Sequence, residues 1–282
     1  MTNARELKRR IRTIRNIERT VDAMQKISAA RLARIRNATI GGRPYANALV
    51  ALVHDLAASG HVPHPLFDIR EGEGYLLLAI GADRGMCGSY NTNVMRAATE
   101  FISTRRREKV RFVTAGRRIR QFTPRTRASV VHETLDHQRP LSEAGIASVA
   151  DIVINAYLKR DAVRVYFLYT EFRSATGNRP VVRRILPVMP APKVSATERL
   201  FEPGPAEILD RLMPLYVRTA VRQAFTEAET SEHAARMVTM EQASVSARRM
   251  ISELTLVANR LRQSAITREL ADIVGTTEAL TV

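Results

Sequence analysis

The segment GADRGMCGSYN at residues 81–91 has the residue types of a phosphate-binding turn. Its glycines come between a predicted strand and a predicted helix, which is where phosphate loops hold nucleotides. The spacing of Gly81, Gly85 and Gly88 fits neither the dinucleotide fingerprint nor the P-loop pattern. We therefore favour the alternative, a tight surface turn, and expect no bound cofactor.

The other reactive side chains do not form a catalytic or metal-binding pattern. Cys87 is the single cysteine, so an internal disulfide and a cysteine-based zinc site are excluded, and the residue is predicted to pack rather than to react. His61 and His64 lack an acidic third ligand and indicate an exposed connector. No Ser-His-Asp order or carboxylate pair is visible. The chain is not predicted to be an enzyme.

The formal charge of +16 predicts attraction to anionic partners such as nucleic acid, phospholipid or acidic protein loops. Residues 1–40 hold 11 Lys and Arg against 3 Asp and Glu, whereas residues 206–282 hold 9 against 10. The basic runs lack the interleaved aromatics of nucleic-acid sites, so they are predicted to be solvated helix faces. The longest apolar run, residues 75–82, is far shorter than the roughly 20 residues of a membrane span.

Both ends of the chain have helical periodicity. The N-terminal apolar stripe consists of Leu7, Ile11, Ile14, Ile17, Val21, Met24, Leu32 and Ile35. It continues beyond the Arg-rich start, which favours a mature helix over a transit peptide. Gly41, Gly42 and Pro44 then interrupt the pattern, and residues 45–57 form either a bent continuation or a separate helix.

The C-terminal pattern predicts a coiled-coil seam that pairs with the N-terminal helix. Its positions are Val217, Val221, Ala224, Ala228, Ser231, Ala235, Val238, Gln242 and Val245. The phase slips near Arg248 and Arg249, as at a stutter. No Gly or Pro occurs between Leu215 and Val274, which predicts a helix of about 60 residues.

The middle of the chain alternates between strand and helix patterns. Strands are predicted at 74–82, 109–116, 162–172 and 180–189, with helices at 91–105 and 142–159. The last two strands are expected to be antiparallel, which gives a mixed sheet of about five strands. The predicted divisions are an N-terminal coiled-coil helix at 1–58, an α/β domain at 74–190 and a C-terminal coiled-coil helix at 206–280.

Several short sequence segments together resemble one family, the gamma subunit of F-type ATP synthases. They are NIERTVDAMQKISAARL, GRPYANAL, ADRGMCGSYNTNV, FEPGP, SEHAARMVTMEQAS and NRLRQSAITRELADIVG. The resemblance implies a long antiparallel coiled coil of the terminal helices and an inserted Rossmann-like α/β domain. It also implies the role of that family, a non-catalytic central rotor stalk that couples ion flow through the membrane ring to ATP synthesis or hydrolysis at the beta subunits.

The resemblance further implies partners and contact positions. The partners would be the alpha and beta subunits of the catalytic hexamer, the epsilon subunit and the ring of membrane c subunits, at the cytoplasmic face of the bacterial membrane. Met24 matches a position that faces an acidic loop of beta, and Glu202 matches the foot near the membrane ring. Turn positions that lie against beta are Asp83, Arg84, Gly85 and Cys87. C-terminal coupling positions are Arg236, Arg262, Gln263, Thr267 and Glu269.

The chain also departs from the family pattern, at residues 20–22 and 246–249. These differences indicate either a divergent branch, such as the alternative ion-pumping F-type ATPases, or ordinary drift. Two other functions are compatible with parts of the sequence: a basic coiled-coil protein that binds nucleic acid, and a small nucleotide-dependent α/β enzyme that uses the 81–91 turn.

Overall fold

The computed structural model describes residues 4–59, 63–105, 109–126, 128–134, 141–189 and 204–280. Their elements are, in chain order, α1 (Ala4–Ser59), β1 (Tyr75–Ile80), α2 (Tyr90–Ser103), β2 (Val110–Ala115), α3 (Arg117–Phe122), the 3-10 turn η2 (Thr123–Thr126), β3 (Ser129–Thr134), α4 (Glu143–Leu158), β4 (Arg164–Glu171), β5 (Arg179–Leu186) and α5 (Pro205–Leu280). Contacts group the chain into two compact units. Unit 1 combines residues up to Ile27 with residues from Met237 onward, and unit 2 runs from Ser28 to Arg236.

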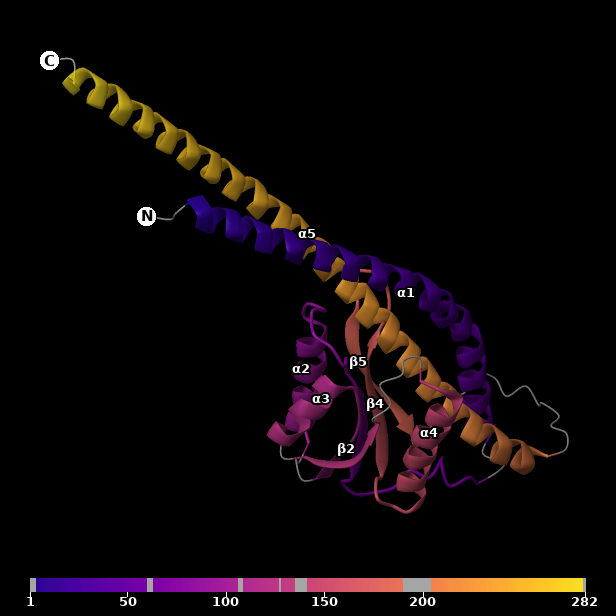
Figure 1. The fold of residues 1–282 in the computed structure, drawn as a ribbon. Coiled ribbons are helices and arrows are strands. Elements are labelled where there is room, and N and C mark those ends of the chain that lie inside the picture. The colour runs from indigo at the N-terminus through magenta and orange to yellow at the C-terminus, as the bar shows by residue number, and fades with distance from the viewer. Residues whose placement is uncertain are drawn as a thin grey trace. The chain divides into compact units, whose positions relative to one another are not determined.

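Unit 2 contains a mixed five-stranded sheet with the strand order β3-β2-β1-β4-β5 (Figure 1). The first four strands are parallel, with Leu77 of β1 opposite Phe112 of β2, and β5 runs antiparallel to β4. The predicted α/β class and the antiparallel β4–β5 pair are confirmed. The sequence did not locate β3 or α3, because both are six residues long and carry no clear period.

Helices cover both faces of this sheet. On one face, α4 and the parts of α1 and α5 within unit 2 pack on Leu76, Leu78 and Phe167. On the other face, α2 and α3 pack on Leu77 and Leu168. Successive strand residues point to opposite faces. A strand that is covered on both faces needs apolar residues at every position, which explains the unbroken apolar run in β1.

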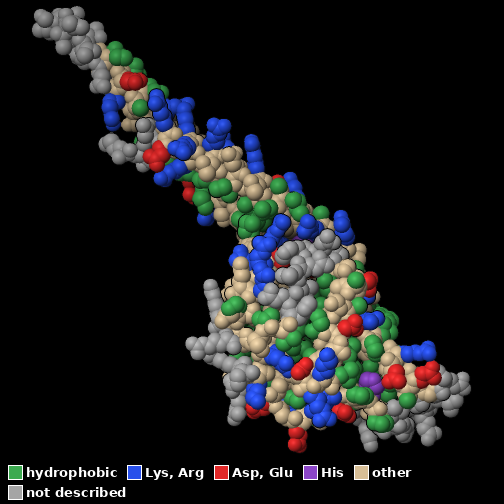
Figure 2. All heavy atoms as spheres, turned by 60° about the horizontal axis from the view of Figure 1, so that its bottom comes forward, with side chains coloured by type: hydrophobic (Ala, Val, Ile, Leu, Met, Phe, Trp, Pro, Cys, Tyr) green, Lys and Arg blue, Asp and Glu red, His purple; other side chains and the backbone are tan. Residues whose placement is uncertain are grey.

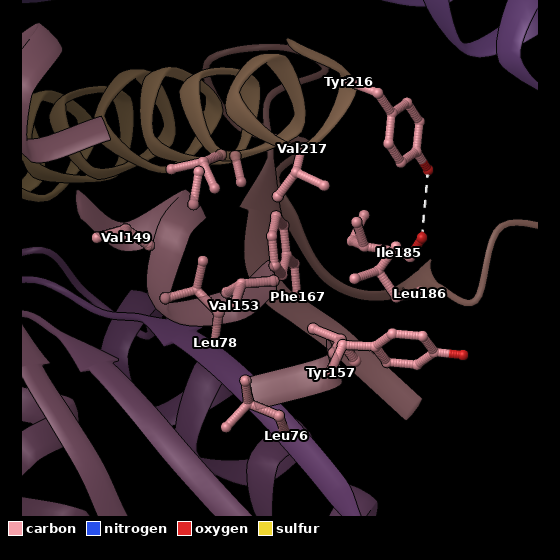
Figure 3. Close-up of a cluster of buried hydrophobic side chains, with 14 of the residues drawn as sticks. Leu76, Leu78, Val149, Val153, Tyr157, Phe167, Ile185, Leu186, Tyr216 and Val217 are labelled. Atoms are coloured by element: carbon pink, nitrogen blue, oxygen red, sulfur yellow. Dashed lines mark hydrogen bonds between the residues drawn. The ribbon is translucent and has the colours of Figure 1, made fainter. Parts of the chain in front are cut away.

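The larger core cluster joins α5 to the sheet. Val217 of α5 points toward Phe167 of β4, and both side chains are fully buried (Figure 3). Beside them, the Tyr216 hydroxyl donates to the Ile185 carbonyl at 3.4 Å. Burial raises the pKa of Tyr216 to about 12. α5 is therefore held against the sheet by apolar packing with a polar bond at its edge.

The helix α1 continues through Gly41, Gly42 and Pro44 without a break, which confirms the bent continuation. Figure 1 shows α1 curving within its Ser28–Ser59 part. Proline removes one backbone hydrogen bond and crowds the preceding turn, so a bend is expected at this point. Beyond it, Val53 and Leu56 are buried in the core over the sheet.

The predicted α5 seam is buried in unit 2, in a core that contains the sheet as well as α1. Ala228 and Ser231 are fully buried. The Ser231 hydroxyl donates to the Thr170 carbonyl at 3.0 Å, and the Ala228 carbonyl accepts from the Tyr90 hydroxyl at 3.1 Å. The sequence predicted α1 as the neighbour of this segment, and the structure adds contacts with β4 and α2, because apolar periodicity shows which face is buried and not what buries it.

In unit 2, α5 also meets α1 through the polar residues Glu227 and Thr230, each one position before a seam residue. The Thr39 and Thr230 hydroxyls lie 2.7 Å apart, and Arg43 pairs with Glu227 at 2.8 Å. Because these contacts run in opposite directions along the two helices, the pair is antiparallel in this unit.

Unit 1 consists of the remaining parts of α1 and α5, which also pack antiparallel. Arg248 pairs with Glu18 at 3.0 Å, while Asn259 lines a groove with Lys8. The buried apolar residues of this pair are Leu7, Ile11, Met240 and Ala247. Three predicted stripe or seam residues of this unit are exposed instead, namely Ile17, Gln242 and Val245. In this unit α5 packs on α1, so the face of α5 that meets α1 is buried. The predicted seam positions Gln242 and Val245 lie on another face, which is exposed.

Truncation of Phe167 should strongly destabilise unit 2. Phe167→Ala is expected to lower the free energy of unfolding by about 3–5 kcal/mol, since it leaves a cavity in the fully buried core. Val182→Ala on β5 is the control, where Val182 is 39% exposed and the loss should be below about 0.5 kcal/mol. Urea unfolding of the full chain, followed by circular dichroism, measures both. Similar losses for the two variants would contradict this core.

The corrected seam in unit 1 is tested by two truncations five residues apart. Met240→Ala should destabilise the helix pair by about 2–3 kcal/mol, because the side chain is buried against α1. Val245→Ala should change it by less than about 0.5 kcal/mol, since Val245 is 61% exposed. Amide hydrogen exchange of the free chain reports the opening of this pair. If Val245→Ala proved the more damaging variant, the seam read from the sequence would be right and the structure wrong.

Candidate functional site

The 81–91 turn connects the end of β1 to the start of α2, and hydrogen bonds from its first two residues and from Asp83 tie it to neighbouring elements. The Ala82 amide donates to Asn91 Oδ1 at 3.1 Å, and the Gly81 amide donates to the Ala115 carbonyl at 2.8 Å. The Arg117 amide, at the start of α3, donates to Asp83 Oδ1 at 2.9 Å. The first two amides of the turn, which a phosphate loop would offer to a ligand, therefore bond to α2 and β2, and the Asp83 side chain bonds to the start of α3.

The glycines of this turn have structural reasons to be glycine. A Cβ at Gly81 would lie 3.1 Å from the Cβ of Ile119 on α3, so a larger residue would push the helix away. Gly88 has a φ of 56°, in the left-handed region that glycine adopts without steric cost. The interpretation of the segment as a tight turn therefore has a physical basis.

Cys87 packs inside this turn. Its side chain is 2% exposed, and Asn91 Nδ2 donates to the sulfur at 3.2 Å. Burial raises the pKa of the Cys87 thiol, and the nearby Arg236 charge offsets only part of that increase. A thiol in this setting is a poor nucleophile at neutral pH.

The structure brings one distant residue to the turn. Arg236 of α5 donates to Glu232 at 2.7 Å and to the Gly85 carbonyl at 3.5 Å, across 151 positions of sequence. Arg236 and Glu232 are nearly buried, so the pair is weakly screened by solvent. The family resemblance gave the turn and Arg236 as separate contact positions. In the structure they form one cluster.

The other positions that the resemblance singled out do not join this cluster. Met24 is half-buried on the unit 1 part of α1. Four residues of α5 in unit 1 have exposed side chains: Arg262, Gln263, Thr267 and Glu269. Glu202 lies outside the described residues. The family contact roles of all these positions stay predictions.

A basic groove on unit 1 was missed by the sequence reasoning. It has a volume of about 600 Å³ and is lined by Lys8, Ile11, Arg12, Arg15, Asn16, Arg19, Thr255, Ala258 and Asn259. Figure 2 shows Lys and Arg side chains standing along the paired helices of this unit. None of these described lining residues is acidic. The sequence does contain the pattern that predicts this groove: the four basic residues of α1 recur at steps of four, three and four, so they share one helix face.

The same unit exposes large apolar side chains on α5. Leu256, Ile266, Leu270 and Ile273 are between 49% and 60% exposed. Exposed apolar groups that gather on one element mark interaction surfaces. Over the described ranges, no helix is both long and apolar enough to cross a membrane. No group of three metal-binding side chains occurs in the part of the chain that the structure describes.

Burial of Cys87 predicts slow alkylation. At pH 8 the folded chain should react with iodoacetamide at least about tenfold more slowly than glutathione does, because a raised thiol pKa leaves less thiolate and the sulfur is enclosed. Raising the pH through the shifted pKa should increase the rate, and 8 M urea should abolish the difference. Mass spectrometry of the alkylated peptide measures the rate. Alkylation as fast as that of glutathione at pH 8 would contradict the buried position.

Comparisons with known proteins point to one family over nearly the whole chain. The family model described as ATP synthase matches residues 3–280. The ATP synthase gamma chain of Pelotomaculum thermopropionicum is 34% identical and that of Desulfitobacterium hafniense is 37% identical, each over 99% of this chain and 100% of the relative.

Solved structures share the fold. A chain of the Euglena gracilis mitochondrial ATP synthase, in the OSCP/F1/c-ring structure, has a TM-score of 0.69 at 18% identity and covers 98% of this chain and 94% of that one. A chain of the Tetrahymena thermophila central stalk and c-ring structure has a TM-score of 0.60 at 18% identity, covering 80% and 99%. With full-length relatives above 30% identity and a family model that spans nearly every residue, the chain belongs to the ATP synthase gamma chain family.

Proposed function

We propose that this chain is the central rotor stalk of an F-type ATP synthase or ATPase. It couples ion flow through a membrane ring to ATP synthesis or hydrolysis at the beta subunits. The observation that carries this proposal is the helix pair of unit 1, whose apolar and basic surfaces are left uncovered by the chain itself. A protein that works alone would be expected to bury Leu256 and Leu270 rather than expose them.

The partners of this surface follow from its chemistry and from the family. Exposed apolar residues near the end of α5 suit an apolar sleeve formed by the alpha and beta subunits. The basic groove of α1 suits acidic loops of beta, and we place Met24, Arg262, Gln263, Thr267 and Glu269 at further contacts. In unit 2 we assign the 81–91 turn to a contact with beta, in which Asp83, Arg84 and Gly85 face the partner and the enclosed Cys87 and Arg236 hold the turn in place.

The remaining assignments concern partners and location. The α/β domain would contact the epsilon subunit and the ring of c subunits, with Glu202 at the membrane-ring foot. The chain would act as a peripheral subunit on the cytoplasmic face of a bacterial membrane. It would contribute no catalytic group and hold no cofactor, since nucleotide chemistry belongs to the beta subunits in this family.

Such a stalk acts by presenting different faces to identical partners. Each beta subunit meets a different side of the shaft and is shifted toward a different nucleotide state, and rotation exchanges those states. The contacts must also release. Exposed ion pairs are worth only about 0–1 kcal/mol each, so Arg and Lys in the groove can guide acidic loops without locking them.

Rotation is the direct test. The full chain would be assembled with the alpha and beta subunits of its host, the hexamer fixed to a surface and a bead attached to the α/β domain. ATP should then drive unidirectional rotation of the bead. A chain that does not assemble with alpha and beta, or that is instead retained on DNA in a salt-sensitive manner, would contradict the proposal and favour a nucleic-acid-binding function.

The groove can be tested with a charge-matched pair of variants. Arg12→Gln/Arg15→Gln removes two charges from the groove, and Arg9→Gln/Arg10→Gln removes two from the same helix outside it. In the complete complex the groove variant should lower ATP-driven ion pumping by about threefold, because two exposed contacts of up to about 1 kcal/mol each are lost. Fluorescence quenching in vesicles measures pumping. Equal effects of the two variants would indicate a role for net charge and not for the groove.

A further inference from the structure

A buried carboxylate joins three elements of unit 2 at one point. Glu227 of α5 accepts two hydrogen bonds from Arg43 of α1, at 2.8 and 2.9 Å. It also accepts one from the Phe172 amide at 2.8 Å, just beyond the end of β4, and one from Gln223 of its own helix at 2.8 Å. The same guanidinium donates to the Phe172 carbonyl at 2.5 Å. Both helices and the sheet are thus bonded through one side chain.

The bond geometry indicates a rigid connection. The Glu227 side chain is 4% exposed and that of Arg43 is 35% exposed. The two-pronged pairing of guanidinium and carboxylate fixes orientation as well as distance. The hydrogen bonds with Glu227 raise the pKa of Arg43, so the guanidinium keeps its charge.

Packing alone would define the register of the helices weakly at this level. Of the neighbouring buried residues of α5, Ala224, Ala228 and Ser231 have small side chains that interlock little with a partner, and Phe225 is the one large apolar side chain among them. On the α1 side, the contacts one turn away are the hydroxyls of Thr39 and Thr230. Buried ion pairs add little net stability compared with apolar residues, but they can specify a unique register.

The same point is where α1 is locally weakest. Arg43 lies between Gly41–Gly42 and Pro44, residues that cost helix stability through backbone freedom and a missing hydrogen bond. A Cβ at Gly41 would meet no other atom within 4 Å, so packing does not support the helix there. The bond to Glu227 therefore restrains the segment most able to twist.

We infer that Arg43 and Glu227 are positioning residues that clamp α1 and α5 to the carboxyl end of β4, so that torque passes between the sheet and the helix pair without slippage. The inference rests on the proposed rotor function. It assigns to this pair a role in coupling that exceeds its role in stability, and it concerns a site within unit 2 that is separate from the groove and the 81–91 turn.

The test compares ion pumping with ATP hydrolysis in the complete complex in vesicles. Glu227→Gln keeps the shape but removes the charge, and Arg43→Met/Glu227→Met replaces the pair with apolar side chains, a change that folding usually tolerates. Ions pumped per ATP should fall by about fivefold or more in both, while hydrolysis and the unfolding temperature of the complex stay near those of the wild type. Arg43→Lys, which keeps one charged bond, should recover part of the ratio.

The matched control is Glu143→Gln, which removes the exposed pair of Glu143 and Arg222 between α4 and α5 and should leave the ratio unchanged. Three results would overturn the clamp: a wild-type ratio in the double methionine variant, an equal loss of pumping and hydrolysis, or the same loss in the control. If Glu227→Gln does not assemble, the double variant decides. Failure of the rotor proposal is recognised separately, since the wild-type complex itself would then neither rotate nor pump.

Discussion

The close approach of α5 to the sheet is the contact on which the rest of unit 2 depends. Small side chains at Ala224, Ala228 and Ser231 let the helix backbone come near enough for the Ser231 and Tyr90 hydroxyls to bond across the interface. Larger residues would hold the helix away and break those bonds. Because α5 is fixed in this way, its adjacent polar face with Glu227 and Thr230 is held where it meets α1.

This arrangement explains how one helix can serve two neighbours. Toward the sheet α5 presents Val217, Val221 and small residues, which bury apolar area. Toward α1 it presents Glu227 and Thr230, which set orientation through hydrogen bonds. Within the described residues of unit 1 the neighbour of α5 is α1, and the larger Met240 is buried there. The character of each face follows from what covers it.

The chemistry of the chain is consistent with a mechanical role. At the 81–91 turn, Asp83 and Asn91 bond to backbone amides of the chain, and Cys87 is enclosed. The uncovered surfaces lie on unit 1 instead, as apolar side chains and a basic groove. Surfaces of this kind gain free energy only when a partner covers them, which agrees with membership of a family whose members are named as chains of ATP synthase.

The sequence by itself determined the element types, four of the five strands, the antiparallel β4–β5 pair and the family. Periodicity and apolar runs are local properties, so they report which residues are buried in a helix or strand. They could not locate β3, whose position depends on pairing with β2. They also could not show that Arg236 meets Gly85 or that Glu227 meets Arg43 and Phe172.

Only the tertiary structure decided which neighbour covers each buried face. The stripe from Val217 to Ser231 has the spacing of a coiled-coil seam, yet it packs on the sheet, and Val245 continues the same spacing while facing solvent. A period of about 3.5 residues identifies a face but carries no information on the partner. Which element covers a face depends on contacts between residues far apart in the chain, and those form only when the whole unit folds.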